Sequence, residues 1–158
     1  MRAHKPPTDQ TLPPAGIARR LGAMFYDGLL LLGVTWAVTA LEIALKVAVV
    51  GADTVRESGE RALGGPLLQV SLLVVVFLFF GWFWTRSGQT LGMQAWRIRL
   101  DSDDGGRISW PQALVRFAGA AVSAACLGAG YWWMLADRER LTWHDRWSRS
   151  RVVRLPRR

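Results

Sequence analysis

The strongest constraint on this chain is an apolar run that begins with two arginines, RRLGAMFYDGLLLLGVTWAVTAL, from Arg19 to Leu41. A helix needs about 20 apolar residues to cross the hydrocarbon core of a bilayer, and this run has that length. One carboxylate, Asp27, lies inside it, ~10 Å from Arg20 along a helix axis. Such a residue costs at least ~2.5–3.5 kcal/mol at membrane depth and usually pairs or lines a polar path.

The spacing of Arg20, Ala23 and Asp27 is i, i+3, i+7, which places the three residues on one stripe of a helix. Arg20 can extend inward and Asp27 leans toward the N-terminus, so the spacing predicts a direct or water-bridged contact between them. Two interpretations remain open. Asp27 either fixes packing by binding Arg20 or a neighbouring backbone group, or it takes part in moving or sensing an ion.

Composition favours a membrane protein over a soluble one. The 158 residues are 51% hydrophobic, and the apolar residues fall in three blocks separated by charges. The net charge of +8 comes from arginines that flank these blocks, so we expect no nucleic acid partner. The chain has one cysteine and no metal-ligand, phosphate-loop or nucleophile motif, so we expect no metal, no cofactor and no enzymatic activity.

Two spanning helices are predicted, from about Ile17 to Leu45 and from Pro66 to about Trp84. The connection over residues 42–65 has three basic against four acidic residues and is expected outside the cell. The N-terminus is therefore expected in the cytoplasm.

The third apolar block, Ala113–Ala136, is rich in small residues over Gly119–Ala125, which permit close helix approach and, in the scaffold alternative, form a face that receives a helix of another protein. It precedes a tail, residues 137–158, with eight arginines and three acidic residues, which favours the cytoplasm. Three full spans would place that tail outside. A re-entrant segment that reverses at Gly128–Gly130 is therefore favoured, with a full span as the alternative.

An extended segment lies between the second and third blocks. Trp96, Ile98 and Leu100 alternate with arginines, which predicts a strand, and DSDDGG predicts a turn. Arg107–Trp110 is the expected return strand, and Val152–Leu155 is a candidate third strand. The predicted class is an all-α membrane protein with two spanning helices, the third small-residue segment and a short cytoplasmic β-hairpin. Its expected parts are a flexible tail (1–18), a membrane domain (19–154) and a basic end (155–158).

Several spaced motifs together resemble one family. They are Arg20-x-x-Ala23-x-x-x-Asp27, GQTLG at Gly88–Gly92, an extended segment with an Asp/Gly turn at Ile98–Gly106, Arg116, and His144-Asp145. This set is similar to the RDD family of bacterial membrane proteins. The resemblance implies a multi-pass protein of the bacterial inner membrane, and the arginine and two aspartates of the family's name correspond to Arg20, Asp27 and Asp145.

Two departures from the family pattern limit what can be carried over. Met93 stands where a lysine is usual, and Ser148-Arg149-Ser150 stands where Ala-Gly-Thr is usual. The family has no established common activity, although transport has been proposed for it.

The predicted polar or ion site is Arg20, Asp27 and Asp145, with Arg20 bridging the two aspartates. Gln89, Thr90, Arg116 and His144 are possible supporting residues. The simpler alternatives are a cap or turn for Gln89-Thr90 and a backbone hydrogen bond for His144. The expected function is transport of a proton or small cation, and the alternative is a non-transporting scaffold or assembly factor. Expected partners are the lipid bilayer and either further copies of the chain or a larger membrane protein.

Overall fold

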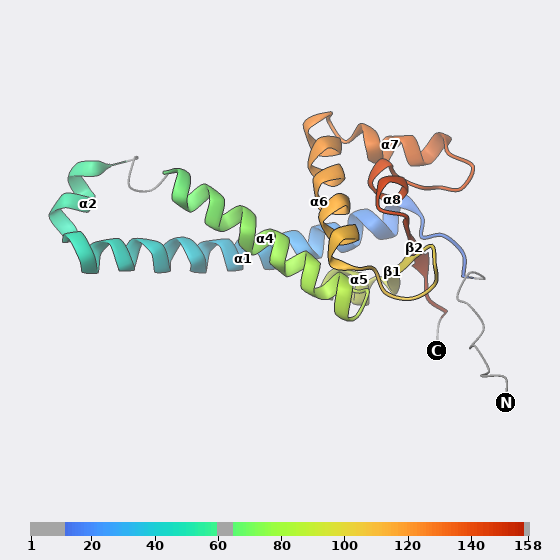
Figure 1. Ribbon diagram of the computed structural model, residues 1–158, viewed down its shortest axis with the longest axis horizontal. Helices are drawn as coiled ribbons and strands as arrows, with labels where there is room; N and C mark the ends of the chain where they lie inside the picture. Colours follow the sequence, from blue (N-terminus) through green and yellow to red (C-terminus); the bar gives the residue numbers. More distant parts are fainter. Residues whose placement is uncertain (1–11, 60–64, 157–158) are drawn as a thin grey trace. The chain divides into compact units, whose positions relative to one another are not determined.

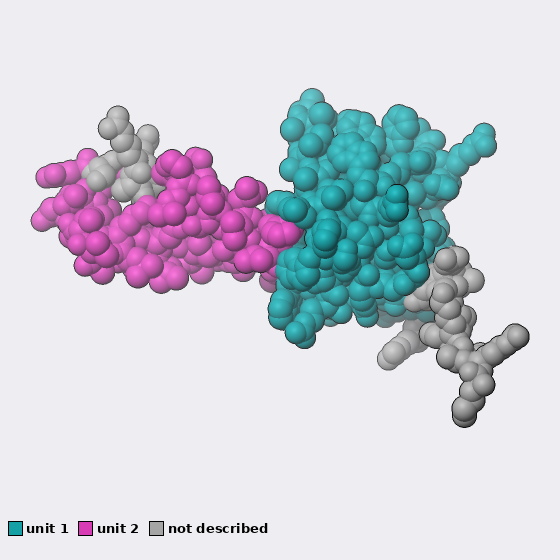
Figure 2. Space-filling view, in the orientation of Figure 1, with its two compact units in different colours: residues 1–27, 80–158 teal, residues 28–79 magenta. Residues whose placement is uncertain are grey.

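The computed structural model describes residues 12–59 and 65–156. Those residues form two compact units, shown in different colours in Figure 2. Unit 1 comprises the described residues up to Asp27 and from Phe80 onward, and unit 2 is Gly28–Phe79. Parts of the predicted N-terminal tail (1–11), outer connection (60–64) and basic end (157–158) lie outside the described residues.

The two predicted spanning helices are present. Helix α1 is Ile17–Val50 and helix α4 is Pro66–Arg86, and each is long and apolar enough to cross a membrane. Helix α1 is five residues longer than expected and ends before Gly51, which adopts a positive φ of 88°. A short helix, α2 (Ala52–Ser58), then occupies part of the connection expected to be a loop.

The apolar side chains of unit 2 face outward, as a lipid environment requires. Trp36, for example, is 75% exposed. The hydroxyls of Thr35 and Thr39 donate to the carbonyls of Leu31 and Thr35, both at 2.8 Å, so they need no water partner. An exposed apolar surface of this kind needs an apolar environment, and lipid tails provide one.

The third apolar block is two helices, α6 (Trp110–Ala125) and α7 (Ala129–Ala136), bent by 96°. The bend lies at Leu127 and Gly128, which adopt left-handed φ values of 54° and 76°. A break was expected slightly later, at Gly128–Gly130. The pair is either a broken span or a re-entrant loop, so the described residues hold two candidate spans, or three.

The sheet has two antiparallel strands, but its return strand differs from the prediction. Strand β1 (Ile98–Ser102) pairs with β2 (Ser150–Arg154), from Ile98 opposite Arg154 to Ser102 opposite Ser150. Arg107–Trp110 forms no strand, because Ser109 and Gln112 form a capping box that starts α6 there. The candidate strand at Val152–Leu155 is present as Ser150–Arg154, so it begins two residues earlier and ends one residue earlier.

Strand β2 also contacts the segment that precedes α1. The Ala15 amide donates to the Val152 carbonyl (2.9 Å), and the Arg154 amide donates to the Pro13 carbonyl (2.8 Å). Figure 1 shows β1 and β2 side by side, next to the short helices α5 (Leu91–Ala95) and α8 (Trp143–Trp147). The core of unit 1 gathers around this sheet and consists mainly of Ala15, Ala23, Trp84, Met93, Ile98, Leu100, Ile108, Ala113 and Val152.

Candidate functional site

Asp145 is a buried carboxylate held by two arginines from different helices. Arg20 Nη1 of α1 lies 2.5 Å from Asp145 Oδ2, and Arg116 Nη1 of α6 lies 2.6 Å from Oδ1. All three side chains are buried. Asp145 is placed by a capping box at the start of α8, in which it exchanges hydrogen bonds with Thr142. The predicted contact between Arg20 and Asp145 is therefore present.

The protonation state of Asp145 follows from these neighbours. Burial by itself raises the pKa of this carboxyl, but the charges of Arg116 and Arg20 outweigh burial and hold the pKa well below its usual range. Asp145 is consequently ionised at physiological pH. It balances part of the charge of the two buried guanidinium groups and joins α1, α6 and α8.

Of the predicted contacts, a direct one between Arg20 and Asp27 is absent from the described residues. Asp27 Oδ2 accepts a hydrogen bond from the Thr90 hydroxyl (2.5 Å), and Oδ1 accepts one from the Gly92 amide (2.8 Å). Arg20 instead uses its other donors on the carbonyls of Ala15 (3.2 Å) and Arg140 (3.5 Å). The start of α5 thus supplies the donors that the sequence assigned to Arg20.

Helix α5 can approach α1 this closely because its second residue is glycine. A Cβ at Gly92 would collide with the Ala23 carbonyl oxygen and would lie 2.9 Å from Asp27 Cγ. Thr90 is the N-cap of α5, and its Oγ1 also accepts a hydrogen bond from the Met93 amide (3.2 Å). The Thr-x-Gly sequence therefore builds a carboxylate-binding turn, and Thr90 is both a cap and a partner of Asp27.

The other supporting residues have distinct positions. Gln89 Nε2 donates to the Ile98 carbonyl (2.7 Å), so its side chain orients β1. Arg116 also donates to the Ser150 hydroxyl (2.9 Å) and lies over the Trp84 ring. Gln89 therefore helps to position β1, and Arg116 helps to position β2 and α4 around the site.

His144 is almost fully buried, and its Nδ1 has no hydrogen-bond partner among the described residues. The expected backbone hydrogen bond is thus absent at this atom. Its ring packs against Tyr131, with centroids 4.9 Å apart. Burial, reinforced by the nearby charge of Arg116, lowers the pKa of His144 to about 3, so the imidazole is neutral at physiological pH.

A cavity of about 330 Å³ connects several of these groups within unit 1. Sites for small ligands in proteins typically measure about 300–1,000 Å³. Asp27, Thr90, His144, Tyr131 and the two arginines lie on its wall, and most of the remaining wall is apolar, formed by residues such as Phe80, Trp84, Phe117, Ala120 and Ala124. Asp145 and Gln89 are not among the lining residues.

The chemistry of the cavity follows from its lining. It presents one carboxylate held by neutral donors, a neutral imidazole, hydroxyl groups and two guanidinium groups that are paired with Asp145. The carboxylate suits exchange of a proton or contact with a small cation. Among residues 12–59 and 65–156, no group of three His, Cys, Asp or Glu residues could hold a metal ion. The sequence did not reveal the cavity or the packing of Tyr131 against His144 in its wall, because neither belongs to a local motif.

The small-residue segment is used partly within the chain itself. A Cβ at Gly119 would lie 2.9 Å from Trp147 and 3.0 Å from His144 Cβ, and one at Gly130 would lie 2.6 Å from the Ser123 hydroxyl oxygen. Glycine therefore lets α6 approach both α8 and α7. The face predicted to receive a helix of another protein is, at these positions, already occupied.

Comparison with known proteins gives one match. The model of the RDD family matches residues 14–149. The motifs of the resemblance, from Arg20 to Asp145, all lie within this region. No curated protein and no solved structure matches the chain.

Proposed function

Because this chain belongs to the RDD family and has two helices able to cross a membrane, we propose that it is a transporter that binds a proton or small cation at Asp27. The observation that carries the proposal is the contrast between its two buried aspartates. Asp145 is paired with two guanidinium groups, whereas the donors to Asp27 among the described residues are the neutral groups of Thr90 and Gly92.

A carboxylate without a cationic side chain beside it can bind and release a proton or a small cation. Protonation of Asp145 would leave two buried arginines without their shared carboxylate, which is costly. Protonation of Asp27 leaves no such charge, and the Thr90 hydroxyl can donate to the ionised carboxylate or accept from the protonated one. Asp27 also lines the cavity, so an ion or proton can reach it without disruption of the Asp145 cluster.

Contacts within unit 1 support a membrane topology for this function. The segment before α1 is hydrogen-bonded to β2, near the C-terminal end, so both lie on the same side of a membrane that α1 crosses. Helix α4 returns the chain to that side. The bent pair α6–α7 then enters and leaves on one face, as a re-entrant segment. The arginines of the C-terminal region favour the cytoplasm of a bacterial cell for that face.

Two spanning helices cannot enclose a pore by themselves, so the transporting form is proposed to be a homo-oligomer with two-fold symmetry. The rival function is a scaffold or assembly factor in the membrane. It predicts no flux from this protein alone and stable co-purification with a larger membrane protein.

The decisive experiment reconstitutes the full chain in vesicles that contain a pH-sensitive dye. A Na⁺ or K⁺ gradient should drive proton movement well above that of protein-free vesicles. Asp27→Asn keeps the shape of the side chain, removes its charge, and should reduce this flux about tenfold or more. The matched control is Asp103→Asn, which removes a partly exposed carboxylate paired with Arg151, outside the lining of the cavity.

Three outcomes separate the possibilities. Flux that is lost in Asp27→Asn and retained in Asp103→Asn supports the proposal. Equal flux in Asp27→Asn and the parent contradicts a role for Asp27. A parent that moves no more protons than empty vesicles under every gradient contradicts transport and favours the scaffold.

A further inference from the structure

A second cavity, of about 510 Å³, lies in unit 1 where α1 begins. Its lining comes from three parts of the chain: the segment that leads into α1, the loop between α7 and α8, and the end of β2. The lining residues are Pro13, Pro14, Gly16, Ala18, Arg19, Arg140 and Arg154. None of them lines the cavity that contains Asp27.

Backbone contacts hold the three arginines in place. The Arg154 amide donates to the Pro13 carbonyl at 2.8 Å, which fixes the end of β2 beside the entry to α1. Arg20 Nη2 donates to the Arg140 carbonyl at 3.5 Å, which holds the loop against the same place. Arg19 Nη1 donates to the Trp96 carbonyl at 3.0 Å. The cavity is therefore part of the fold.

The charge of this cavity is not neutralised within the described part of the chain. Among the described residues, its lining contains no acidic residue, and neither Arg140 nor Arg154 forms an ion pair with any of them. Other arginines at the surface of unit 1 do: Arg146 pairs with Asp137 at 2.5 Å, and Arg151 pairs with Asp103 at 3.1 Å. Helix α1 also has no acidic residue in its first turn, so the positive end of its dipole adds to the arginines.

We propose that this cavity binds a phosphate group. Guanidinium groups present paired N–H donors that match phosphate oxygens, and three arginines line this cavity with no acidic residue among the described lining residues. The apolar part of α1 begins directly after Arg20, so the cavity lies at the depth of lipid headgroups when α1 crosses a bilayer. Its phosphate can come from an anionic phospholipid headgroup or from solution. The site does not depend on transport by Asp27.

The test measures ligand retention by the purified full chain in detergent, using native mass spectrometry. Short-chain phosphatidylglycerol, phosphatidylcholine and inorganic phosphate are titrated separately. The parent should retain phosphatidylglycerol over phosphatidylcholine, and Arg140→Gln with Arg154→Gln should weaken that retention about tenfold or more.

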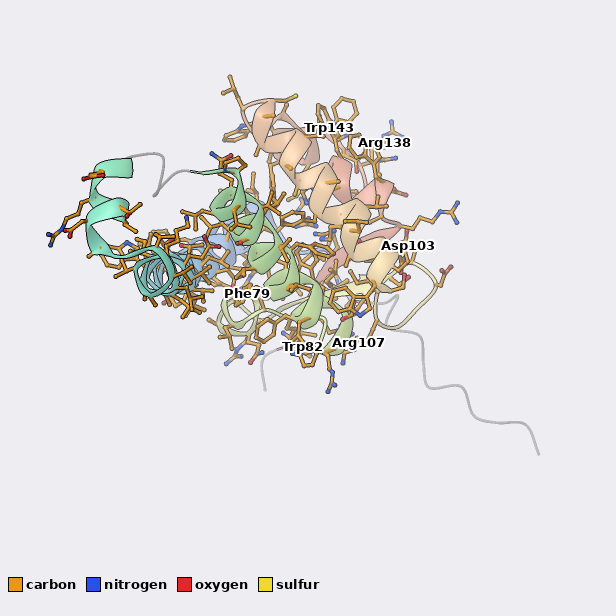
Figure 3. The ribbon with its side chains drawn as sticks, turned by 60° about the vertical axis from the view of Figure 1, so that its left-hand side comes forward. Phe79, Trp82, Asp103, Arg107, Arg138 and Trp143 are labelled. Carbon is orange, nitrogen blue, oxygen red and sulfur yellow. The ribbon has the colours of Figure 1, made fainter. Side chains whose placement is uncertain are left out.

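The matched control is Arg138→Gln with Arg149→Gln, which removes the same charge outside the cavity. Arg138 is exposed and lies at the outer edge of unit 1 in Figure 3. Arg149 has a positive φ of 48°, close to the 54° of Arg140, so both double variants place one glutamine in a left-handed conformation. The control should retain phosphatidylglycerol as the parent does.

The outcomes divide cleanly. Phosphatidylglycerol binding that inorganic phosphate does not displace assigns the site to a lipid headgroup, and binding of inorganic phosphate by itself assigns it to free phosphate. Equal losses in the two double variants, or no preference over phosphatidylcholine together with no phosphate binding, overturn the proposal. If the glutamine variant does not fold, Arg140→Lys with Arg154→Lys replaces it. This variant keeps the charge and should still weaken phosphate binding, because lysine lacks the paired donors. Unchanged binding in the lysine variant overturns the proposal.

Discussion

At the scale of single residues, the two aspartates of the family motif differ in what holds them. Asp145 is fixed by Arg20 and Arg116, and Asp27 is fixed by a hydroxyl and a backbone amide. The first arrangement stabilises an ionised group, and the second permits a change of charge. One arginine and two aspartates therefore do not form a single three-residue cluster.

The separation of the aspartates predicts how their substitutions combine. Arg20→Ala leaves Asp145 with one of its two guanidinium partners and should cost about 3–5 kcal/mol of unfolding free energy. Adding Asp27→Asn should not recover the loss, because Asp27 is not the partner of Arg20. Thermal unfolding of the two single variants and the double variant in detergent measures this. Recovery of stability in the double variant would show that the two side chains interact.

A second residue-scale prediction concerns pH. The pKa of His144 falls from 6.5 to about 3 in the fold, so between these values the unfolded chain binds more protons than the folded one. The stabilisation from neutral His144 is complete above pH 6.5 and decreases as the pH falls. Unfolding free energy should drop by about 2 kcal/mol between pH 7 and pH 5.

The matched variant for this prediction is His144→Asn, whose stability should vary much less between pH 7 and pH 5. Asp145 does not interfere in this range, because its contribution is lost only as the pH falls below the ordinary carboxyl pKa of 3.8. A parent whose melting temperature is the same at pH 7 and pH 5 would contradict the assignment of a buried neutral imidazole.

At the scale of elements, glycines decide where helices meet. Gly119 lets α6 pack on α8, and Gly92 lets α5 pack on α1. The sequence pattern of small residues correctly indicated close helix approach, but these contacts form within one chain. Their role in the fold precedes any role in binding another protein.

Gly119→Ala should therefore destabilise the protein, by about 1–3 kcal/mol, because the added methyl group meets Trp147 and His144 in a packed interface. The control is Gly33→Ala in α1, where an added Cβ would lie within 4 Å of no described atom beyond its chain neighbours and the adjacent backbone of its own helix. Alanine there should be neutral or stabilise the helix by up to about 1 kcal/mol. Equal melting temperatures for the two variants would contradict the contact between α6 and α8.

At the scale of the whole molecule, the sheet connects distant parts of the chain. Strand β2 lies between β1 and the Pro13–Ala15 segment, so the residues before α1, after α4 and after α7 meet in one layer of unit 1. A membrane protein can build such a layer only on one side of the bilayer. The sheet therefore constrains the topology more strongly than the charge tally does.

Both termini should consequently lie on the same side of the membrane, and the arginines of the C-terminal region predict that this side is the cytoplasm. A reporter that is active only in the cytoplasm, fused after Arg158 in the full chain, should be active, and the same reporter fused before Met1 should match it. Substituted cysteines in the connection between α2 and α4 should react with an impermeant reagent added to intact cells. An external reporter after Arg158 would contradict the re-entrant arrangement of α6 and α7.

The sequence by itself determined the spanning helices, the break in the third apolar block and the set of polar residues. These features depend on local hydropathy and spacing, which neighbouring residues establish without the rest of the fold. It also identified most of strands β1 and β2, and the family by its motifs.

Only the tertiary structure decided which groups meet. Asp27 could reach Arg20 along one helix, yet it binds Thr90, which is 63 positions away. Strand β1 likewise pairs with β2 and not with the nearby Arg107–Trp110. In each case a partner nearby in the sequence was available. The packing of the core instead brought a group distant in the sequence within hydrogen-bonding distance.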